Sequence, residues 1–447
     1  MAAAELLQRA LQEKGVKYCM ASFVDMHGVS KAKFVPIDHL GHMLEGSELY
    51  TGAALEGVPQ DVSEEEVAAH PDRESCTVLP WQTDVAWFAS DLWCHGKPFD
   101  ACSRNILGFQ EERARKHGYV FKLGIEAEFY VLREVDGKIV PGADRDQLRL
   151  PCYDARGALD NLGWLGELVQ AMQTLGWGVY SFDHEDGNGQ FEIDFNYANG
   201  RVTADRYVFF RMMAGQIAAR HGCFASFMPK PFADKTGSGA HFNISLADAT
   251  TGRNLFDDPS DPQGCGLSAL GYQFVAGVVR HLPAITAVVA PTVNSYKRLV
   301  KQGAMSQFTW APVFACFGNN NRTNAVRIPR AGGRMELRAA DSACNPYLGA
   351  ALVLAAGLEG IEQGLDSGPP NRDNMYLKSP EELRRLGVGM LPRSLGEALE
   401  AFREDALAAR VFGESMSGAW LAQKEREWLS FQNHVSEWER DRYLRMY

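Results

Sequence analysis

The sequence lacks the long apolar runs and the basic blocks that mark two large classes of protein. Its longest apolar runs, such as residues 284–290, are too short to span a bilayer, so we expect no membrane association. The 447 residues carry a net charge of −11 without a cluster of lysine and arginine, which argues against nucleic acid as a partner. Residues 2–11 are amphipathic and lack the apolar core of a signal peptide, so we expect a cytoplasmic protein.

Cysteine pairs, internal repeats and low-complexity linkers are also missing. The nine cysteines are scattered without a CxxC pair, which favours a reducing compartment over a disulfide framework. A chain of this length buries a large core and is expected to form two or more domains.

What the sequence does contain is five short stretches in which polar and apolar residues alternate. They are residues 125–129, 182–185, 190–193, 240–245 and 334–338. Period two is the side-chain period of a β-strand, so each stretch sets its polar residues on one face of a sheet. Together these faces hold five carboxylates and one imidazole, from Glu126, Glu128, Glu185, Glu192, Glu336 and His241.

Polar side chains that face one interior are costly unless they bind a charged ligand. Carboxylate oxygens with an imidazole nitrogen are typical ligands of hard divalent cations. Arg334 and Arg338 on the last strand indicate that the cations share their site with an anion. The pattern therefore predicts metal-dependent phosphoryl chemistry.

The turn between two of these strands is predicted from the pair Asn188-Gly189, which favours a two-residue hairpin loop. A hairpin centred there pairs Glu185 with Glu192, and two carboxylates directly opposite each other repel. The alternative for this hairpin alone is a solvent-facing strand pair that binds nothing.

The order of predicted elements changes near residues 102–103. Before this point a first helix is followed by mainly strand-like segments, such as residues 17–24 and 31–35. After it, helices at 104–116, 158–174 and 204–221 alternate with strands. Residues 395–447 form a charged, amphipathic helical region.

An ordered series of motifs runs through the chain. They are Gly124-Ile125-Glu126-Ala127-Glu128-Phe129, His184-Glu185 with Gly189-Gln190-Phe191-Glu192, Gly237-Ser238-Gly239-Ala240-His241, Asn294-Ser295-Tyr296-Lys297-Arg298-Leu299, Asn321-Arg322 with Arg327-Ile328-Pro329, Arg334-Met335-Glu336-Leu337-Arg338 and Asn345-Pro346-Tyr347-Leu348. With these motifs the chain resembles the glutamine synthetase superfamily over nearly its whole length.

The resemblance implies an α+β fold. A small β-grasp domain would cover residues 1–103, and a large catalytic domain with a curved antiparallel sheet and helices would cover residues 104–447. It also implies a homo-oligomer, a dodecamer of two stacked hexameric rings with active sites between adjacent subunits, and a C-terminal helix that ties the rings together.

The resemblance further implies two or three Mg²⁺ or Mn²⁺ ions per site and ATP as co-substrate. The implied ligands of one ion are Glu128, Glu185 and Glu192, and those of the second are Glu126, His241 and Glu336. The implied contacts with the glutamate and phosphate groups are Gly237, Arg298, Arg334 and Arg338, and the implied contacts with ATP are Asn243, Ser245, Arg322, Arg327 and Arg334. Histidine is usual in the family at the place of Asn243.

The implied reaction has two steps. The γ-carboxylate of L-glutamate attacks ATP to give γ-glutamyl phosphate, and an amine then displaces phosphate to form an amide. Divalent ions that bridge phosphate oxygens and arginines that bind carboxylate or phosphate through two hydrogen bonds suit this chemistry.

Three positions depart from the pattern of ammonia-using relatives. Thr51 and Trp310 stand where those relatives carry the acidic groups that bind and deprotonate ammonium, and Thr236 replaces an asparagine. An aromatic face suits an alkylammonium through burial and cation–π attraction of about 0.5–2 kcal/mol. Residues 303–310 resemble the branch that contains glutamate–methylamine ligases, so we expect methylamine as the amine and a role for Thr51 and Trp310 at its site.

Alternatives stay open at this point. One is a glutamine synthetase with a rebuilt ammonium site, and another is a non-catalytic structural member, against which the intact set of six ligands argues. Trp310 could simply pack the flap. Tyr376 falls near a tyrosine that is adenylylated in some bacterial relatives, but its surroundings differ, so we expect an unmodified structural tyrosine.

Overall fold

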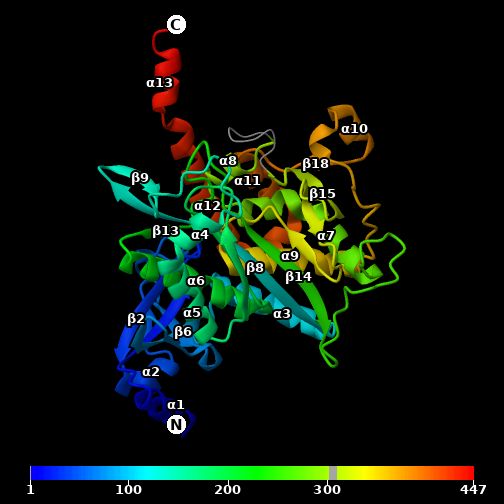
Figure 1. Cartoon of the computed structure of the whole chain (residues 1–447). Helices are drawn as coiled ribbons and strands as arrows, with labels where there is room; N and C mark the ends of the chain where they lie inside the picture. Colours follow the sequence, from blue (N-terminus) through cyan, green and yellow to red (C-terminus); the bar gives the residue numbers. More distant parts are fainter. Residues whose placement is uncertain (1, 302–309) are drawn as a thin grey trace.

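The computed structural model describes residues 2–301 and 310–447, which fold around two β-sheets (Figure 1). Within these residues the N-terminal sheet has seven strands, in the order β2-β1-β6-β4-β3 with β5 and β7 paired to β6. The strands are β1 (Tyr18–Val24), β2 (Ser30–Pro36), β3 (Glu48–Tyr50), β4 (Val67–Pro71), β5 (Thr77–Leu79), β6 (Gln82–Cys94) and β7 (Lys97–Pro98). Helices α1 (Ala2–Glu13) and α2 (Leu40–Leu44) accompany this sheet.

The larger sheet has eleven strands among the described residues, in the order β10-β11-β8-β14-β17-β16-β15-β18, with β9, β12 and β13 paired to β8. The strands are β8 (Tyr119–Val135), β9 (Lys138–Pro141), β10 (Val179–His184), β11 (Gln190–Phe195), β12 (Ala198–Asn199), β13 (Phe224–Ser226), β14 (Ala240–Asp248), β15 (Phe314–Asn319), β16 (Asn324–Ile328), β17 (Met335–Leu337) and β18 (Gly389–Met390). In the described part of this sheet, β15 and β16 run parallel and the other pairs are antiparallel. The predicted α+β class is confirmed. The domain boundary at residue 103 stays a prediction, although no described strand crosses it.

All five alternating stretches lie in the larger sheet, as predicted. The apolar residues of β8 and β14 face helices: the Phe129 ring lies 5.4 Å from the ring of Phe210 on α6, and Phe242 contacts Gly349 on α9. Helices α6 (Gly200–Arg220) and α9 (Pro346–Glu362) therefore cover one face of the sheet. The alternate, polar residues of these strands are left on the opposite face.

The remaining helices pack around this sheet. They are α3 (Ser103–Lys116), α4 (Ala155–Asp160), α5 (Leu162–Thr174), α7 (Ala269–Val289), α8 (Ser295–Arg298), α10 (Pro380–Arg385), α11 (Leu395–Glu404), α12 (Ala406–Asn433) and α13 (Glu437–Tyr443), with short 3₁₀ turns at Ile37–His39, Gly52–Ala54, Arg73–Ser75 and Met375–Leu377. The predicted helices are present, but the one expected at 158–174 is divided into α4 and α5 at Asn161.

Helix α7 is long and apolar enough, by length and composition, to cross a bilayer. However, 72% of its most apolar window is buried inside the fold. A Cβ atom on Gly277 of α7 would lie 2.1 Å from the carbonyl oxygen of Ala356 on α9, so the two helices touch through their backbones. This tight packing in the core accounts for the apolar composition of α7.

The predicted register of the β10–β11 hairpin is wrong. Glu192 lies opposite Asp183, and Glu185 bonds through its backbone N–H to the carbonyl of Gln190 at 2.9 Å. A turn is centred on Asn188-Gly189 as predicted, because the N–H of Gln190 donates to the carbonyl oxygen of Gly187 at 2.8 Å. However, the tight hairpin form of this turn needs a positive φ at both central positions, and of the two only Gly189 has one (79°). The loop is therefore longer, and it takes its shape from contacts outside the hairpin.

Arg104, near the start of α3, joins the N-terminal sheet to helix α6. It is 4% exposed and lies 2.9 Å from Asp205 of α6, 2.7 Å from Asp91 of β6 and 2.7 Å from Asp72 after β4. Removal of a buried cation that three carboxylates share is strongly destabilising, because all three carboxylates lose their counter-charge together.

We expect Arg104→Leu to lower the free energy of unfolding by about 3–5 kcal/mol, because the variant leaves the three carboxylates unpaired. Urea unfolding followed by circular dichroism would measure the change. Arg113→Leu on the same helix is the control, since its ion pair with Glu362 is about one-third exposed and should contribute less than about 1 kcal/mol. Equal midpoints for the two variants would contradict the role given to Arg104.

Candidate active site

Neighbouring strands place the predicted metal ligands side by side. Strand β8 lies between β11 and β14, and its register sets Glu192 opposite Glu128 and His241 opposite Glu126. Strand β17 adds Glu336, which lies opposite Asn243 of β14. Side chains of directly opposite residues lie about 5 Å apart, which is the spacing that a shared ligand needs.

The six predicted ligands form two groups. The ligand atoms of Glu128, Glu185 and Glu192 lie within 4.8 Å of one another, and those of Glu126, His241 and Glu336 do the same. These are the two sets that the resemblance to the glutamine synthetase superfamily implies. The structure thus brings all six together, and their role as metal ligands stays a prediction.

The first group destabilises the folded protein when no cation is bound to it. Burial and the nearby Glu128 raise the pKa of Glu185 to about 8, and the same causes raise the pKa of Glu192 well above its usual value. These carboxyl groups face each other without an arginine or lysine pairing them among the described residues. A divalent cation would replace the protons and offset the repulsion, so the donor set fits Mg²⁺ or Mn²⁺.

The second group is already partly neutralised. Burial and the charge of Arg338 lower the pKa of His241 to about 3, so its ring is neutral and can offer a lone pair to a metal. Its Nδ1 lies 3.2 Å from Glu126 and 3.6 Å from Glu336. Burial would raise the pKa of Glu336, but the nearby charges, chiefly that of Arg338 and also that of Arg327, together outweigh burial and hold the pKa of this carboxyl group below its usual value.

Arginines border the second group and leave hydrogen-bond donors unused. Arg327 and Arg338 both donate to Glu336, the first at 2.6 Å. The Nε of Arg338 is buried with no acceptor among the described residues, and Arg322 is exposed at the cavity wall. Guanidinium groups held next to metal ligands suit the oxygens of a phosphate chain.

The Gly-Ser-Gly sequence is required by crowding around Arg298. A Cβ on Gly237 would lie 2.5 Å from the carbonyl oxygen of Pro229 and 2.8 Å from Cγ of Arg298, and one on Gly239 would lie 2.6 Å from Nε2 of His241. The Arg298 guanidinium is buried and donates to the carbonyl oxygens of Arg338 and Ala339 at 2.9 and 3.2 Å. The loop backbone and this guanidinium are thus held in contact.

Both groups border a cavity of about 720 Å³. Six further predicted residues line it: Gly237, Arg298, Trp310, Arg322, Arg327 and Arg338. Trp310 is 55% exposed and has a φ of 57°, which is unusual for a bulky side chain. Its neighbour Ala311 is anchored by the buried Tyr376, whose hydroxyl donates to the Ala311 carbonyl at 2.6 Å, in agreement with a structural role for this tyrosine.

Five predicted residues do not line the cavity of the described chain: Glu336 of the second group, Thr51, Asn243, Ser245 and Arg334. Thr51 is exposed near the N-terminal sheet and donates to Glu66 at 3.1 Å. Asn243 donates to Glu126 and accepts a hydrogen bond from Arg334, both at 2.8 Å, so Asn243 and Arg334 adjoin the second group. Ser245 lies two residues further along β14. Flap residues 303–309 lie outside the described residues.

The cavity also contains residues that the sequence analysis missed. Asp194 continues the period-two pattern of Gln190 and Glu192 on β11, and this signal could have revealed it. Burial and Glu126 raise the pKa of Asp194 to about 7. Lys230 and Lys235 also line the cavity, but they come from a loop without periodicity, so no sequence pattern pointed to them.

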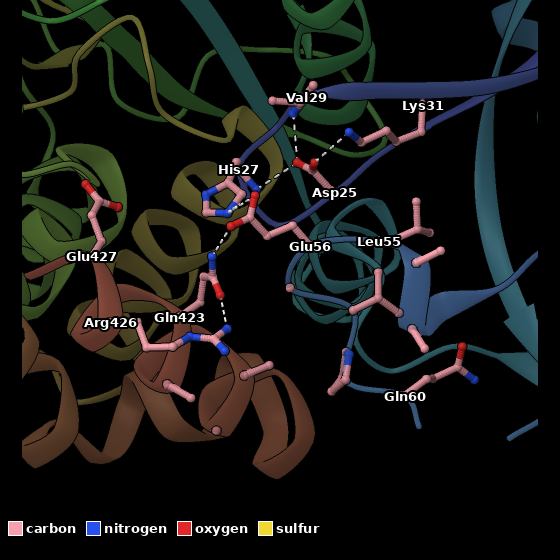
Figure 2. Close-up of a pocket in the computed structure, with 18 residues that line it drawn as sticks. Asp25, His27, Val29, Lys31, Leu55, Glu56, Gln60, Gln423, Arg426 and Glu427 are labelled. Carbon is pink, nitrogen blue, oxygen red and sulfur yellow. Dashed lines mark hydrogen bonds and ion pairs between the residues drawn. The ribbon is translucent and has the colours of Figure 1, made fainter. Parts of the chain in front are cut away.

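A larger cavity, of about 1300 Å³, lies between the loop at residues 53–60 and α12 (Figure 2). Its charged groups bond mainly to one another: Lys31 lies 3.3 Å from Asp25, and Gln423 bridges Glu56 and Arg426. None of the predicted site residues lines it among the described residues. The smaller cavity with the two ligand groups is therefore the candidate active site.

Comparisons with known proteins agree with this geometry. The family described as glutamine synthetase, catalytic domain, matches residues 100–443. A glutamate–methylamine ligase of Methyloversatilis universalis is 40% identical over 98% of this chain and 99% of its own, and a glutamine synthetase of Rhizobium leguminosarum bv. phaseoli is 38% identical over 97% and 98%. A solved GmaS/ADP complex superposes with a TM-score of 0.91 at 38% identity, covering 98% of this chain and 99% of that one.

If the first group binds a metal ion, loss of the single ligand Glu185 should remove most of the stabilisation of the folded protein by that ion. In EDTA-treated protein, Glu185→Gln should unfold at or above the temperature of the parent, because it relieves repulsion with Glu128. Mn²⁺ at one hundred times its Kd should stabilise the parent by about 2.7 kcal/mol and the variant far less. Calorimetry with and without Mn²⁺ would measure both effects.

Glu134→Gln removes the same charge from an exposed position on β8 and serves as the control, which should keep the full response to Mn²⁺. Equal stabilisation of parent and Glu185→Gln by Mn²⁺ would contradict the proposed ligand set.

Proposed function

Since this chain belongs to the glutamine synthetase family, we propose that it is an ATP-dependent ligase that joins the γ-carboxylate of L-glutamate to methylamine. The observation that carries the proposal is the pair of ligand groups that faces one arginine-lined cavity. The relative named glutamate–methylamine ligase supports the choice of amine, and the relatives named glutamine synthetase support ammonia as the alternative.

The six ligands would hold Mg²⁺ or Mn²⁺, which supplies the positive charge that phosphoryl transfer from ATP requires. Arg322, Arg327 and Arg338 line the same cavity and would bind phosphate oxygens, which orients the γ-phosphate toward glutamate. Asn243, Ser245 and Arg334 would serve the nucleotide from the neighbouring strands β14 and β17.

Glutamate would lie in the cavity against Arg298 and the Gly237 loop, which both line it. The buried Arg298 is fixed by two carbonyl oxygens, so it can bind a carboxylate without losing further side-chain freedom. A γ-carboxylate oxygen then attacks the γ-phosphorus and ADP leaves. The neutral amine nitrogen attacks the activated carbonyl carbon and gives up one proton, and inorganic phosphate leaves with that proton as the amide forms.

Trp310 supports an alkylated amine. Its indole borders the cavity where a carboxylate would favour bare ammonium, and it can contact a methyl group and a cationic nitrogen together. Thr51 would take part from an adjacent subunit, because it does not line the cavity of its own chain.

We propose a homo-oligomer of two stacked hexameric rings in the cytoplasm. The C-terminal helix α13 projects from the body of the chain (Figure 1), and its Trp438 is 63% exposed. A large apolar side chain on a projecting arm is suited to contact with a second subunit.

Ammonia is the second candidate amine, and a non-catalytic structural role is the third reading. Retention of several buried carboxylates that raise one another's pKa disfavours a structural role, because such a group destabilises a protein that binds no cation.

The amine preference can be tested with a phosphate-release assay containing glutamate, ATP, Mg²⁺ and a panel of amines. We expect kcat/KM for methylamine to exceed that for ammonia by about 10- to 200-fold, the range that one buried methyl group can supply. Ethylamine should be a slower substrate. Trp310→Ala should lower kcat/KM for methylamine more than for ammonia, whereas Trp310→Phe should keep the preference.

A higher kcat/KM for ammonia in the parent would leave glutamine synthetase as the function. Absence of turnover with every amine, in protein that binds Mn²⁺ and ATP, would leave the structural reading.

Arg298 and Arg327 should affect the binding of different substrates. Arg298→Ala should raise the KM for glutamate at least about tenfold, because a charged hydrogen bond contributes about 1.5–3 kcal/mol. Arg327→Ala should act mainly on the KM for ATP. Steady-state kinetics in both substrates would measure this, with the exposed Arg330→Ala as a control without effect. The reverse assignment would mean that the two roles are misplaced.

A further inference from the structure

The buried carboxylate of Asp146 has no role in the function proposed above. Asp146 lies in the segment between β9 and α4 (Figure 1) and is 2% exposed. Three donors converge on it: Nε2 of His184 at 2.9 Å, Nδ2 of Asn188 at 2.9 Å and the backbone N–H of Gly189 at 2.5 Å. All three belong to the end of β10 and the loop before β11, so one distant side chain holds the whole turn.

This turn carries Glu185. Nδ1 of His184 donates to the carbonyl oxygen of Glu185 at 2.8 Å, so the imidazole joins Asp146 to the backbone of that residue. The N–H of Asp186 then donates to the Glu185 carboxylate at 3.0 Å, which fixes its direction. Through these bonds Asp146 is connected to a side chain of the first ligand group without contacting it.

The same turn also reaches the opposite wall of the cavity. Oδ1 of Asn188 accepts a hydrogen bond from Lys235 at 2.8 Å, and Lys235 lines the cavity. The Nδ2 group of Asn188 is held by Asp146 and by the carbonyl oxygen of Leu148 at 3.0 Å. Asn188 is thereby kept in the orientation that Lys235 requires.

The shape of the turn argues that Asp146 is needed. The Asn-Gly pair by itself favours a two-residue loop, which would set Glu185 opposite Glu192. In the structure Glu192 faces Asp183 instead, and the loop is bonded to Asp146. Because Glu185 and Glu192 repel each other, a contact outside the hairpin must keep Glu185 beside its two partners.

We propose that Asp146 is a positioning residue that holds the β10–β11 turn so that Glu185 can bind a divalent cation together with Glu128 and Glu192. The proposal rests on the proposed metal-dependent function. Removal of a group that orients a metal ligand typically weakens metal binding by about 10- to 100-fold.

The test is Mn²⁺ binding by EPR titration, which counts bound ions independently of turnover. Asp146→Asn keeps the size of the side chain but has one acceptor oxygen in place of two and no charge, so it cannot serve His184, Asn188 and the Gly189 N–H together. We expect about 10- to 100-fold weaker binding of one ion. The KM for Mg²⁺ should rise by a similar factor, while kcat at saturating Mg²⁺ stays within a few-fold of the parent.

Asp144→Asn is the matched control, because it removes the same charge from the same segment at a side chain that is 81% exposed. It should bind Mn²⁺ like the parent. If Asp146→Asn does not fold, as judged by circular dichroism, Asn188→Ala replaces it and should weaken binding of the same ion.

The outcomes separate the two proposals. Unchanged Mn²⁺ affinity in folded Asp146→Asn, or in Asn188→Ala where the first variant does not fold, overturns the positioning role while the metal site stands. A parent that binds no Mn²⁺ overturns the metal-dependent function and the positioning role with it.

Discussion

Mutual repulsion among buried carboxylates is the constraint on which the rest of this structure depends. The register of β11, β8 and β14 sets glutamates opposite a glutamate and a histidine, although adjacent like charges weaken a sheet. The apolar face of the same strands packs on α6 and α9 and keeps the sheet together. A well-packed core on one face allows the other face to carry groups that destabilise it until a cation binds.

The two ligand groups meet this repulsion differently. Arg327 and Arg338 neutralise Glu336 directly, so the second group is close to balanced before any metal arrives. Burial and the neighbouring Glu128 raise the pKa values of Glu185 and Glu192, and no arginine or lysine pairs with this group among the described residues. The first group therefore depends more on its cation and on the contacts that hold its members in place.

The packed and the exposed parts of the site differ in how easily their residues could be replaced. The residues predicted to bind metal and phosphate lie mainly on strands, next to a tightly packed glycine loop where even a Cβ atom would collide with its surroundings. The position that we assign to amine selection, Trp310, instead stands at the exposed rim of the cavity. A change of amine at this rim needs no change in the strands that hold the metal ligands.

The sequence by itself determined the polar face of each strand, the six polar residues that come together there and the family, because period two follows from strand geometry and the motifs are short and local. Asp194 extends the same pattern, so its place on the polar face could also be predicted from the sequence. Only the tertiary structure decided the register of the β10–β11 hairpin, the close packing of Arg298 against Gly237, and the position of Lys230 and Lys235 in the cavity wall. Each of these depends on a contact between residues distant in sequence, such as Asp146 with Gly189, and a local pattern contains no information about such a contact.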